Sequence, residues 1–258
     1  MTLLTNIKTI AKNTFRETIR DRILMSVWFV IIAIILFSLF VGSISHDHNT
    51  RIITNFSVTA IYILQVFIAI FVGSMLIYKE IERKTFYLII PKPISRSAII
   101  IGKCLGLVLT TTLVTSLSTV FLLGILWLSG GTEYFTGVLL STFLGLFEAL
   151  VLILISLLFS SFTSPILAFV ATLAIYLIGH GGPILRFIYM TTEVPILAKS
   201  VELIYHILPN FDKFNIRNDI VYGTLPSISM VALAISYACI YGAFLLFLTV
   251  LVFRKKDF

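Results

Sequence analysis

The sequence predicts an all-α polytopic membrane protein with six transmembrane helices, and three observations predict it. Hydrophobic residues make up 59% of the 258 residues and charged residues only 12%, against roughly 25% charged residues in soluble domains. The mean hydropathy is +1.06. The few charges lie between long uncharged runs. These observations exclude an ordinary soluble enzyme, and the length suits one membrane domain over residues 1–258.

The distribution of Lys and Arg predicts that both termini lie in the cytoplasm. With the N-terminus inside, the cytoplasmic stretches carry fourteen Lys and Arg residues and the opposite side carries five. Such an excess is typical of cytoplasmic loops. The net charge of +7 is therefore explained by Lys and Arg residues in the predicted cytoplasmic stretches. We expect a multi-pass protein of the cytoplasmic (inner) membrane that contacts lipid and no nucleic acid.

Residues 3–22 are predicted to form a basic amphipathic entry helix. Apolar residues recur there at spacings of three to five, and basic residues recur at every fourth position. The basic ridge consists of Lys8, Lys12, Arg16 and Arg20. Such a helix suits the surface of an anionic cytoplasmic leaflet. The alternative is a solvated start to the first span.

Six apolar runs are long enough to cross a hydrocarbon core of about 30 Å. These predicted spans lie at about 23–45, 53–78, 103–129, 137–159, 164–180 and 228–253. About 20 residues of charged sequence precede the first span, so no cleavable signal peptide is expected. Pro165 stands in the first turn of the fifth span, and the Gly and Pro residues of 179–183 are expected to stop it.

The sequence offers little support for a metal site or a disulfide. His46, Asp47 and His48 are direct neighbours without an evident fourth ligand, which favours a polar loop. Cys104 and Cys239 lie in apolar runs and are expected to be small buried residues. We therefore expect no metal site.

Residues 181–227 form a mixed polar and apolar extracytoplasmic loop with short helices, one of them at 196–208. Two roles stay open for this loop. It packs on the ends of the spans as a lid, or it docks an extracytoplasmic partner.

No motif of a soluble catalyst occurs in the chain. The GxxxxGK[ST] phosphate loop, HExxH and GxSxG are all absent from the sequence. If the protein is a transporter without its own nucleotide site, it is driven either by an ion gradient or by a separate ATPase. A gradient-driven carrier usually has several ionisable residues near the midplane and often has internal repeats, and here Glu148 is the only acidic residue deep in an apolar run.

Glu148 is a functional candidate by its position alone. It lines a translocation path, pairs across a dimer interface, or lies near a water-filled mouth. A rival reading is a membrane-embedded enzyme that uses Glu148 with His180 or His206. A second rival is a gradient-driven secondary carrier.

Residues 79–102 form a charged segment between the second and third spans, and this segment carries a resemblance to a known family. It holds two prolines that bar a regular helix. Its pattern is similar to the segment after the second span of type-two ATP-binding-cassette (ABC) permeases, although Lys84 replaces a glycine that is common there. The matching residues are Glu82, Thr85, Pro91, Pro93, Ser95, Arg96, Gly102 and Lys103.

The resemblance implies the permease subunit of an ATP-driven transporter, an exporter in our expectation. It implies pairing with a second permease subunit, as a homodimer, and with two separate ATPase subunits. ATP and Mg²⁺ would be bound by those subunits, and this chain would hold no cofactor and no catalytic residue. The segment 79–102 would then act as a coupling helix flanked by the entry helix. Its expected contact residues are Glu80, Glu82, Arg83, Thr85 and Arg96.

Overall fold

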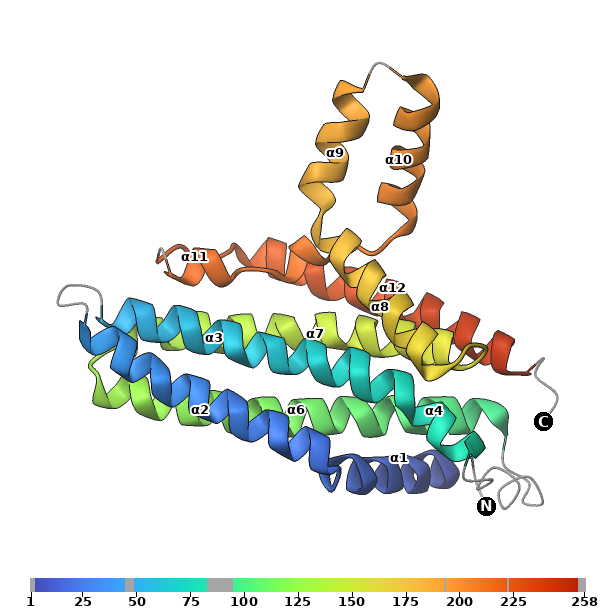
Figure 1. Ribbon diagram of the computed structural model, residues 1–258, viewed down its shortest axis with the longest axis horizontal. Helices are drawn as coiled ribbons and strands as arrows, with labels where there is room; N and C mark the ends of the chain where they lie inside the picture. The colour runs from blue at the N-terminus through green and yellow to red at the C-terminus, as the bar shows by residue number, and fades with distance from the viewer. Residues whose placement is uncertain (1–2, 45–48, 83–94, 193, 222, 255–258) are drawn as a thin grey trace.

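The protein folds as a bundle of long helices from which one helical hairpin projects (Figure 1). The computed structural model describes residues 3–44, 49–82, 95–192, 194–221 and 223–254, and it has no β-strand among them. The α-helices are α1 (Leu3–Ile19), α2 (Arg22–Ile44), α3 (Asn49–Phe67), α4 (Gly73–Glu82), α6 (Arg96–Leu128), α7 (Phe135–Ser160), α8 (Pro165–His180), α9 (Gly182–Thr191), α10 (Pro195–Ile207), α11 (Arg217–Val221) and α12 (Ile228–Arg254). Three short elements complete them: the π-helix η1 (Ile68–Val72) and the 3₁₀ helices η2 (Thr132–Tyr134) and η3 (Phe211–Phe214).

Five helical stretches are long and apolar enough to cross a membrane, or six if a bent pair counts as one span. The bent pair is α8 and α9, which meet at an angle of 66°. The predicted fifth span, 164–180, corresponds to α8, whose 16 residues are fewer than in the other candidate spans. Gly181 and Pro183 explain the break, because Pro183 lies in the first turn of a new helix rather than in a loop.

Helix α7 occupies the centre of the bundle. Its buried residues cover most of its circumference, and it packs against α3, α4, α6, α8 and α12. Most of the apolar stretches of α3 and α6 are also buried, whereas α2 and α12 expose most of theirs. In a bilayer such exposed apolar surfaces are compatible with lipid contact. The only acidic residue that the sequence places deep in an apolar run, Glu148, therefore lies on the innermost helix.

Helix α1 packs along the N-terminal half of α6. The contact depends on Gly102 and Gly106, which stand one turn apart on α6. A Cβ added at Gly106 would lie 2.6 Å from Thr14 Cβ and 2.7 Å from the carbonyl oxygen of Ala11. Small residues at this spacing allow two helix backbones to approach closely. Of the predicted basic ridge, Lys8, Lys12 and Arg16 lie on the exposed side of α1, and Arg20 is exposed in the turn just after its end, so the predicted helix 3–22 stops three residues early.

The second predicted span, 53–78, is interrupted by the π-helix η1. Its widened turn is stabilised from α7, where Ser156 Oγ donates to the Ala69 carbonyl at 3.0 Å. One turn further, Ser160 Oγ donates to the Ser74 carbonyl at 3.0 Å. Side-chain donors of this kind satisfy carbonyls that a widened turn frees. The helices α3 and α4 thus form one rod with a distinct section in its middle.

The hairpin α9–α10 projects away from the bundle (Figure 1). Its two helices contact each other through rings such as Tyr189 and Tyr205, whose centroids are 5.7 Å apart. The predicted short helix at 196–208 corresponds to α10. After α10 the chain returns to the bundle, and η3 and α11 pack against α7, α8 and α3.

Candidate functional site

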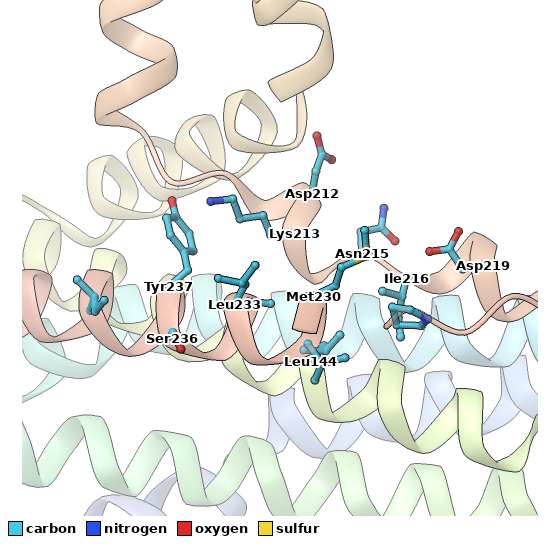
Figure 2. A pocket seen from close by; sticks show the side chains of 14 residues that line it. Leu144, Asp212, Lys213, Asn215, Ile216, Asp219, Met230, Leu233, Ser236 and Tyr237 are labelled. Atoms are coloured by element: carbon cyan, nitrogen blue, oxygen red, sulfur yellow. The ribbon is translucent and has the colours of Figure 1, made fainter. Parts of the chain in front are cut away.

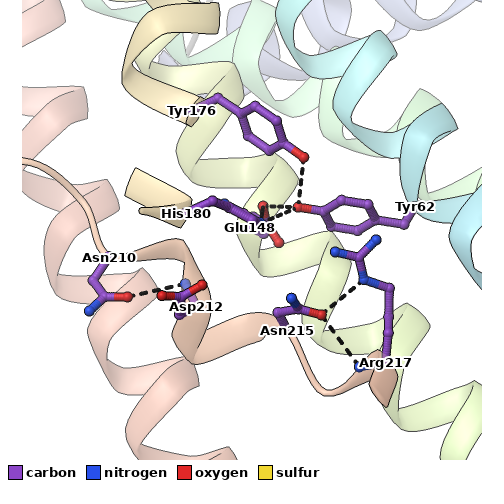
Figure 3. A network of polar contacts seen from close by, with 8 residues as sticks. All are labelled: Tyr62, Glu148, Tyr176, His180, Asn210, Asp212, Asn215 and Arg217. Carbon is purple, nitrogen blue, oxygen red and sulfur yellow. Dashed lines mark hydrogen bonds and ion pairs between the residues drawn. The ribbon is translucent and has the colours of Figure 1, made fainter. Parts of the chain in front are cut away.

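The buried Glu148 side chain is the centre of a polar cluster between α3, α7 and α8 (Figure 3). Only 1% of the residue is exposed. Tyr62 of α3 donates its hydroxyl proton to Glu148 Oε1 across 2.5 Å. His180, the last residue of α8, brings Nε2 to 3.5 Å from the same oxygen. A carboxyl group this deep in a bundle needs polar partners, and three helices supply them.

The Tyr62 hydroxyl joins the members of this cluster. His180 Nε2 lies 2.7 Å from the hydroxyl oxygen. Tyr176, one turn before His180 on α8, donates to the same oxygen across 3.2 Å. One hydroxyl group of α3 is therefore linked to α7 and to two positions of α8.

Arg217, the first residue of α11, covers the cluster from the loop between α10 and α12. Its guanidinium carbon lies 3.7 Å from the centroid of the Tyr62 ring, which is a cation–π geometry. The Nε–H group of Arg217 donates to Asn215 Oδ1 at 2.9 Å. The loop thus places one positive charge on the face of the ring whose hydroxyl contacts Glu148.

Residues 209–217, which we call the outer segment, are held on the bundle by packing. Phe211 and Phe214 of η3 are almost fully buried. Gly179 makes room for the segment, because a Cβ there would lie 2.5 Å from both the Phe211 ring and the Pro209 carbonyl. The backbone N–H of Asn210 donates to the Tyr237 hydroxyl of α12 at 2.9 Å. The outer segment therefore closes one side of the cluster.

Three buried polar atoms of this region have no hydrogen-bond partner among the described residues: Glu148 Oε2, His180 Nδ1 and Asp212 Oδ2. The Asp212 carboxyl lies beside Gly182 at the start of α9. Burial raises the pKa of the Asp212 carboxyl above its ordinary value. Unsatisfied atoms at these positions indicate a site that can still bind a proton, a water molecule or a ligand group.

A cavity of about 630 Å³ lies next to the cluster, between α7, the outer segment and α12 (Figure 2). Its walls are mainly apolar, with residues such as Leu144 and Leu233. Polar groups line the side of the outer segment, where Lys213 points its Nζ at the Tyr237 ring, 3.9 Å from the centroid. A cavity of this composition suits an apolar or amphiphilic molecule.

The structure places the other predicted residues as follows. Glu80 and Glu82 belong to α4 and Arg96 begins α6, while Arg83 and Thr85 lie outside the described residues. His206 is exposed on α10 and is not part of the Glu148 cluster. His46, Asp47 and His48 also lie outside the described residues.

The described residues contain no group of three or more His, Cys, Asp and Glu side chains that could hold a metal ion. Cys104 is buried as expected, whereas Cys239 is exposed on α12 and was wrongly expected to be buried. An exposed cysteine in an apolar helix is compatible with lipid contact.

Sequence reasoning missed Tyr62, Tyr176 and Arg217. The two tyrosines stand in apolar runs, where an aromatic residue gives no signal, and Arg217 is one of several charges in the outer loop. It also missed Lys103 as a buried residue. The Lys103 side chain is 1% exposed on α6, and its Nζ donates to the Leu76 carbonyl of α4 at 3.3 Å.

The chain was compared with known proteins. A family model described as ABC-2 family transporter protein matches residues 8–258. A search of curated proteins finds no match. The family match covers nearly the whole chain, including every element of the Glu148 cluster.

Proposed function

Because the chain belongs to the ABC-2 transporter family, we propose that it is the permease subunit of an ATP-driven exporter whose ATPase is a separate chain. The observation that carries the proposal is this family match over residues 8–258 of a multi-pass helical protein. The sequence has no phosphate-binding loop, so ATP and Mg²⁺ belong to the partner. The proposed assembly is a homodimer of this chain with two ATPase subunits in the inner membrane, both termini cytoplasmic.

The segment 79–102 is the proposed contact with the ATPase. Helices α4 and α6 lead into and out of it, and Lys103 links them by its hydrogen bond to the Leu76 carbonyl. Movement of the segment would therefore displace both helices together. The proposed contact residues remain Glu80, Glu82, Arg83, Thr85 and Arg96.

Helix α1 is proposed to support this contact from the cytoplasmic leaflet. It is fixed to α6 at Gly102 and Gly106, next to the proposed coupling segment. Its exposed basic ridge would bind anionic lipid headgroups, and Lys8 and Arg16 are two of its members. On the other side of the membrane, the hairpin α9–α10 is the proposed site for an extracytoplasmic partner.

Glu148 is proposed to stand on the translocation path, closed toward the outside by the outer segment. The neighbouring cavity of about 630 Å³ would then hold part of the cargo while the segment is seated. The cavity's apolar walls favour a cargo with an apolar part.

The proximity of Glu148 and His180 is the one observation that favours the membrane-enzyme alternative. Membership of a transport family outweighs it, and the described residues offer no group of His, Cys, Asp and Glu side chains that could hold a metal ion beside this pair. A gradient-driven carrier is the other alternative. Transport that continues after ATP depletion would favour that carrier over an ABC exporter.

The test uses the complex purified from the native membrane. We expect an ABC ATPase to co-purify, and ATP hydrolysis to be absent from the isolated chain. The double charge reversal Glu82→Lys with Arg83→Glu should release the ATPase or uncouple its hydrolysis from transport. Glu202→Lys, an exposed reversal on α10, is the matched control and should change neither. Hydrolysis by the isolated chain, or full coupling in the double variant, would refute the proposal.

A further inference from the structure

The Tyr62 hydroxyl can satisfy its three neighbours in only two ways. A phenolic hydroxyl donates one hydrogen bond, and its oxygen accepts up to two. One accepted bond comes from Tyr176. The two remaining neighbours are Glu148 Oε1 at 2.5 Å and His180 Nε2 at 2.7 Å. Tyr62 must therefore donate to one of them and accept from the other.

The two arrangements differ in the place of one proton. In the first, Glu148 is ionised and accepts from Tyr62, while His180 donates its Nε2–H to Tyr62. In the second, Glu148 carries a proton and donates it to Tyr62, while Tyr62 donates to a bare His180 Nε2. The second becomes the first when the Glu148 proton moves to the Tyr62 oxygen and the Tyr62 proton moves to Nε2. His180, then doubly protonated, returns to neutral by losing its Nδ1 proton to water.

Arg217 determines which arrangement is favoured. An ionised carboxylate in an apolar interior is costly without a nearby positive charge. The guanidinium 3.7 Å above the Tyr62 ring is such a charge. When Arg217 is seated, its positive charge balances the negative charge of an ionised Glu148, and His180 is neutral. When Arg217 is withdrawn, protonation of Glu148 removes the unbalanced charge.

The other groups around Glu148 do not replace Arg217. The titratable and charged groups that face it are Tyr62 of α3, Tyr176 and His180 of α8, Asp212 of η3 and Arg217 of α11. Asp212 is acidic, so its charge adds to the cost of an ionised Glu148. Lys213 directs its charge at the Tyr237 ring of α12 instead.

We propose that Glu148 is a proton-binding site whose occupancy is controlled by Arg217, with Tyr62 and His180 relaying the proton from the extracytoplasmic side. The route outward is closed while the outer segment is seated, because His180 Nδ1 is buried and the Phe211 ring lies 5.7 Å from the imidazole. Lifting of the segment removes Arg217 and uncovers Nδ1 in one movement, so Glu148 takes up a proton from outside by the reverse of the two transfers described above. The link to a transport cycle rests on the proposed function, whereas the proton site itself does not.

The test is an infrared pH titration of the purified full-length protein in lipid nanodiscs, following the C=O band of a protonated carboxyl group. Glu148→Gln should remove the band and thereby assign it. Arg217→Gln should raise the pH at which half of the band is lost by about one unit or more, as expected for the loss of a nearby opposite charge. Arg186→Gln, at an exposed arginine of α9, is the control and should leave that pH unchanged. A band that survives in Glu148→Gln, or an unchanged pH in Arg217→Gln, would overturn the proposal.

Two further variants extend the test, one as a substitute for Arg217→Gln and one for the relay. Asn215→Ala serves if Arg217→Gln fails to fold. It removes the hydrogen bond that orients Arg217, and we expect a smaller rise in the pH at which half of the band is lost. Tyr62→Phe keeps the ring under Arg217 and removes the relay, so proton exchange after a pH jump should slow by on the order of 100-fold. Exchange at the wild-type rate would refute the relay. No ATPase is needed, so failure here leaves the proposed function standing, and failure to find an ATPase leaves the band unaffected.

Discussion

Substitution of Gly106 by alanine should separate α1 from α6 and destabilise the protein. The added Cβ would lie 2.6 Å from Thr14 Cβ and 2.7 Å from the Ala11 carbonyl oxygen. The second neighbour is backbone, which cannot rotate away as a side chain can. The two helices must therefore move apart along the contact that also includes Gly102.

The expected size follows from comparison with a second glycine of the same helix. Gly124 has nothing within 4 Å of an added Cβ, so Gly124→Ala is the matched control. Each substitution improves helix propensity by roughly 1 kcal/mol, and this gain cancels in the comparison. Overpacking of a close contact costs about 1–3 kcal/mol. Gly106→Ala should therefore be less stable than Gly124→Ala by about 1–3 kcal/mol.

The assay is reversible unfolding in mixed micelles, combined with hydrogen exchange of the α1 amides. Gly106→Ala should lower the free energy of unfolding relative to Gly124→Ala and should increase exchange in α1, whereas Gly124→Ala should leave α1 protected. Equal stability of the two variants would show that α1 does not pack on α6 in the way described.

Three further predictions concern other parts of the bundle. Lys103→Met keeps the aliphatic stem but removes the charged hydrogen bond to the Leu76 carbonyl, so α4 should detach from α6 at a cost of about 1.5–3 kcal/mol, measured by unfolding. Phe211→Ala should release the outer segment at a cost of about 3–5 kcal/mol, because the ring is fully buried; limited proteolysis reports this release, and Phe187→Ala on the exposed face of α9 is the control. Burial raises the pKa of the Asp212 carboxyl, so the folded protein binds that proton more tightly than the unfolded chain. Stability should then fall as the pH rises from the ordinary carboxyl pKa through the raised one, and Asp212→Asn should abolish this part of the pH dependence.

The spans could be predicted because placing a charge in hydrocarbon is costly, so spanning segments appear in the sequence as long runs with few charged residues. Arg22 and Arg254 bound the first and last of these helices as the gaps in charge predict. The bend between α8 and α9 was only partly predictable from the sequence. The Gly and Pro residues of 179–183 predicted a stop, but a proline can equally begin a new helix, and here it does.

The cluster around Glu148 was only partly predictable, because its members are distant in sequence. Glu148 was found from its own position in an apolar run, and His180 entered as one of two candidate partners. Tyr62 precedes Glu148 by 86 residues, and its hydroxyl carries no pattern that distinguishes it from other aromatic residues of the spans. Arg217 likewise gains its role only from the packing of Phe211 and Phe214, which brings the outer segment onto α8.

The rod formed by α3, η1 and α4 gives the two proposed sites a mechanical connection. Tyr62 and Glu80 are 18 residues apart on this rod, or about 27 Å at 1.5 Å per residue. The Tyr62 end contacts Glu148 and Arg217, and the other end leads into the proposed coupling segment. The π-helix lies between them, held by the Ser156 hydroxyl.

A displacement of α4 would either carry Tyr62 with it or bend the rod at this widened turn, and both change the distance between the Tyr62 hydroxyl and Glu148. Because this hydrogen bond joins Tyr62 to Glu148, an axial shift of the rod would disturb the proton arrangement. The proton site would therefore respond to the ATPase without any direct contact between them.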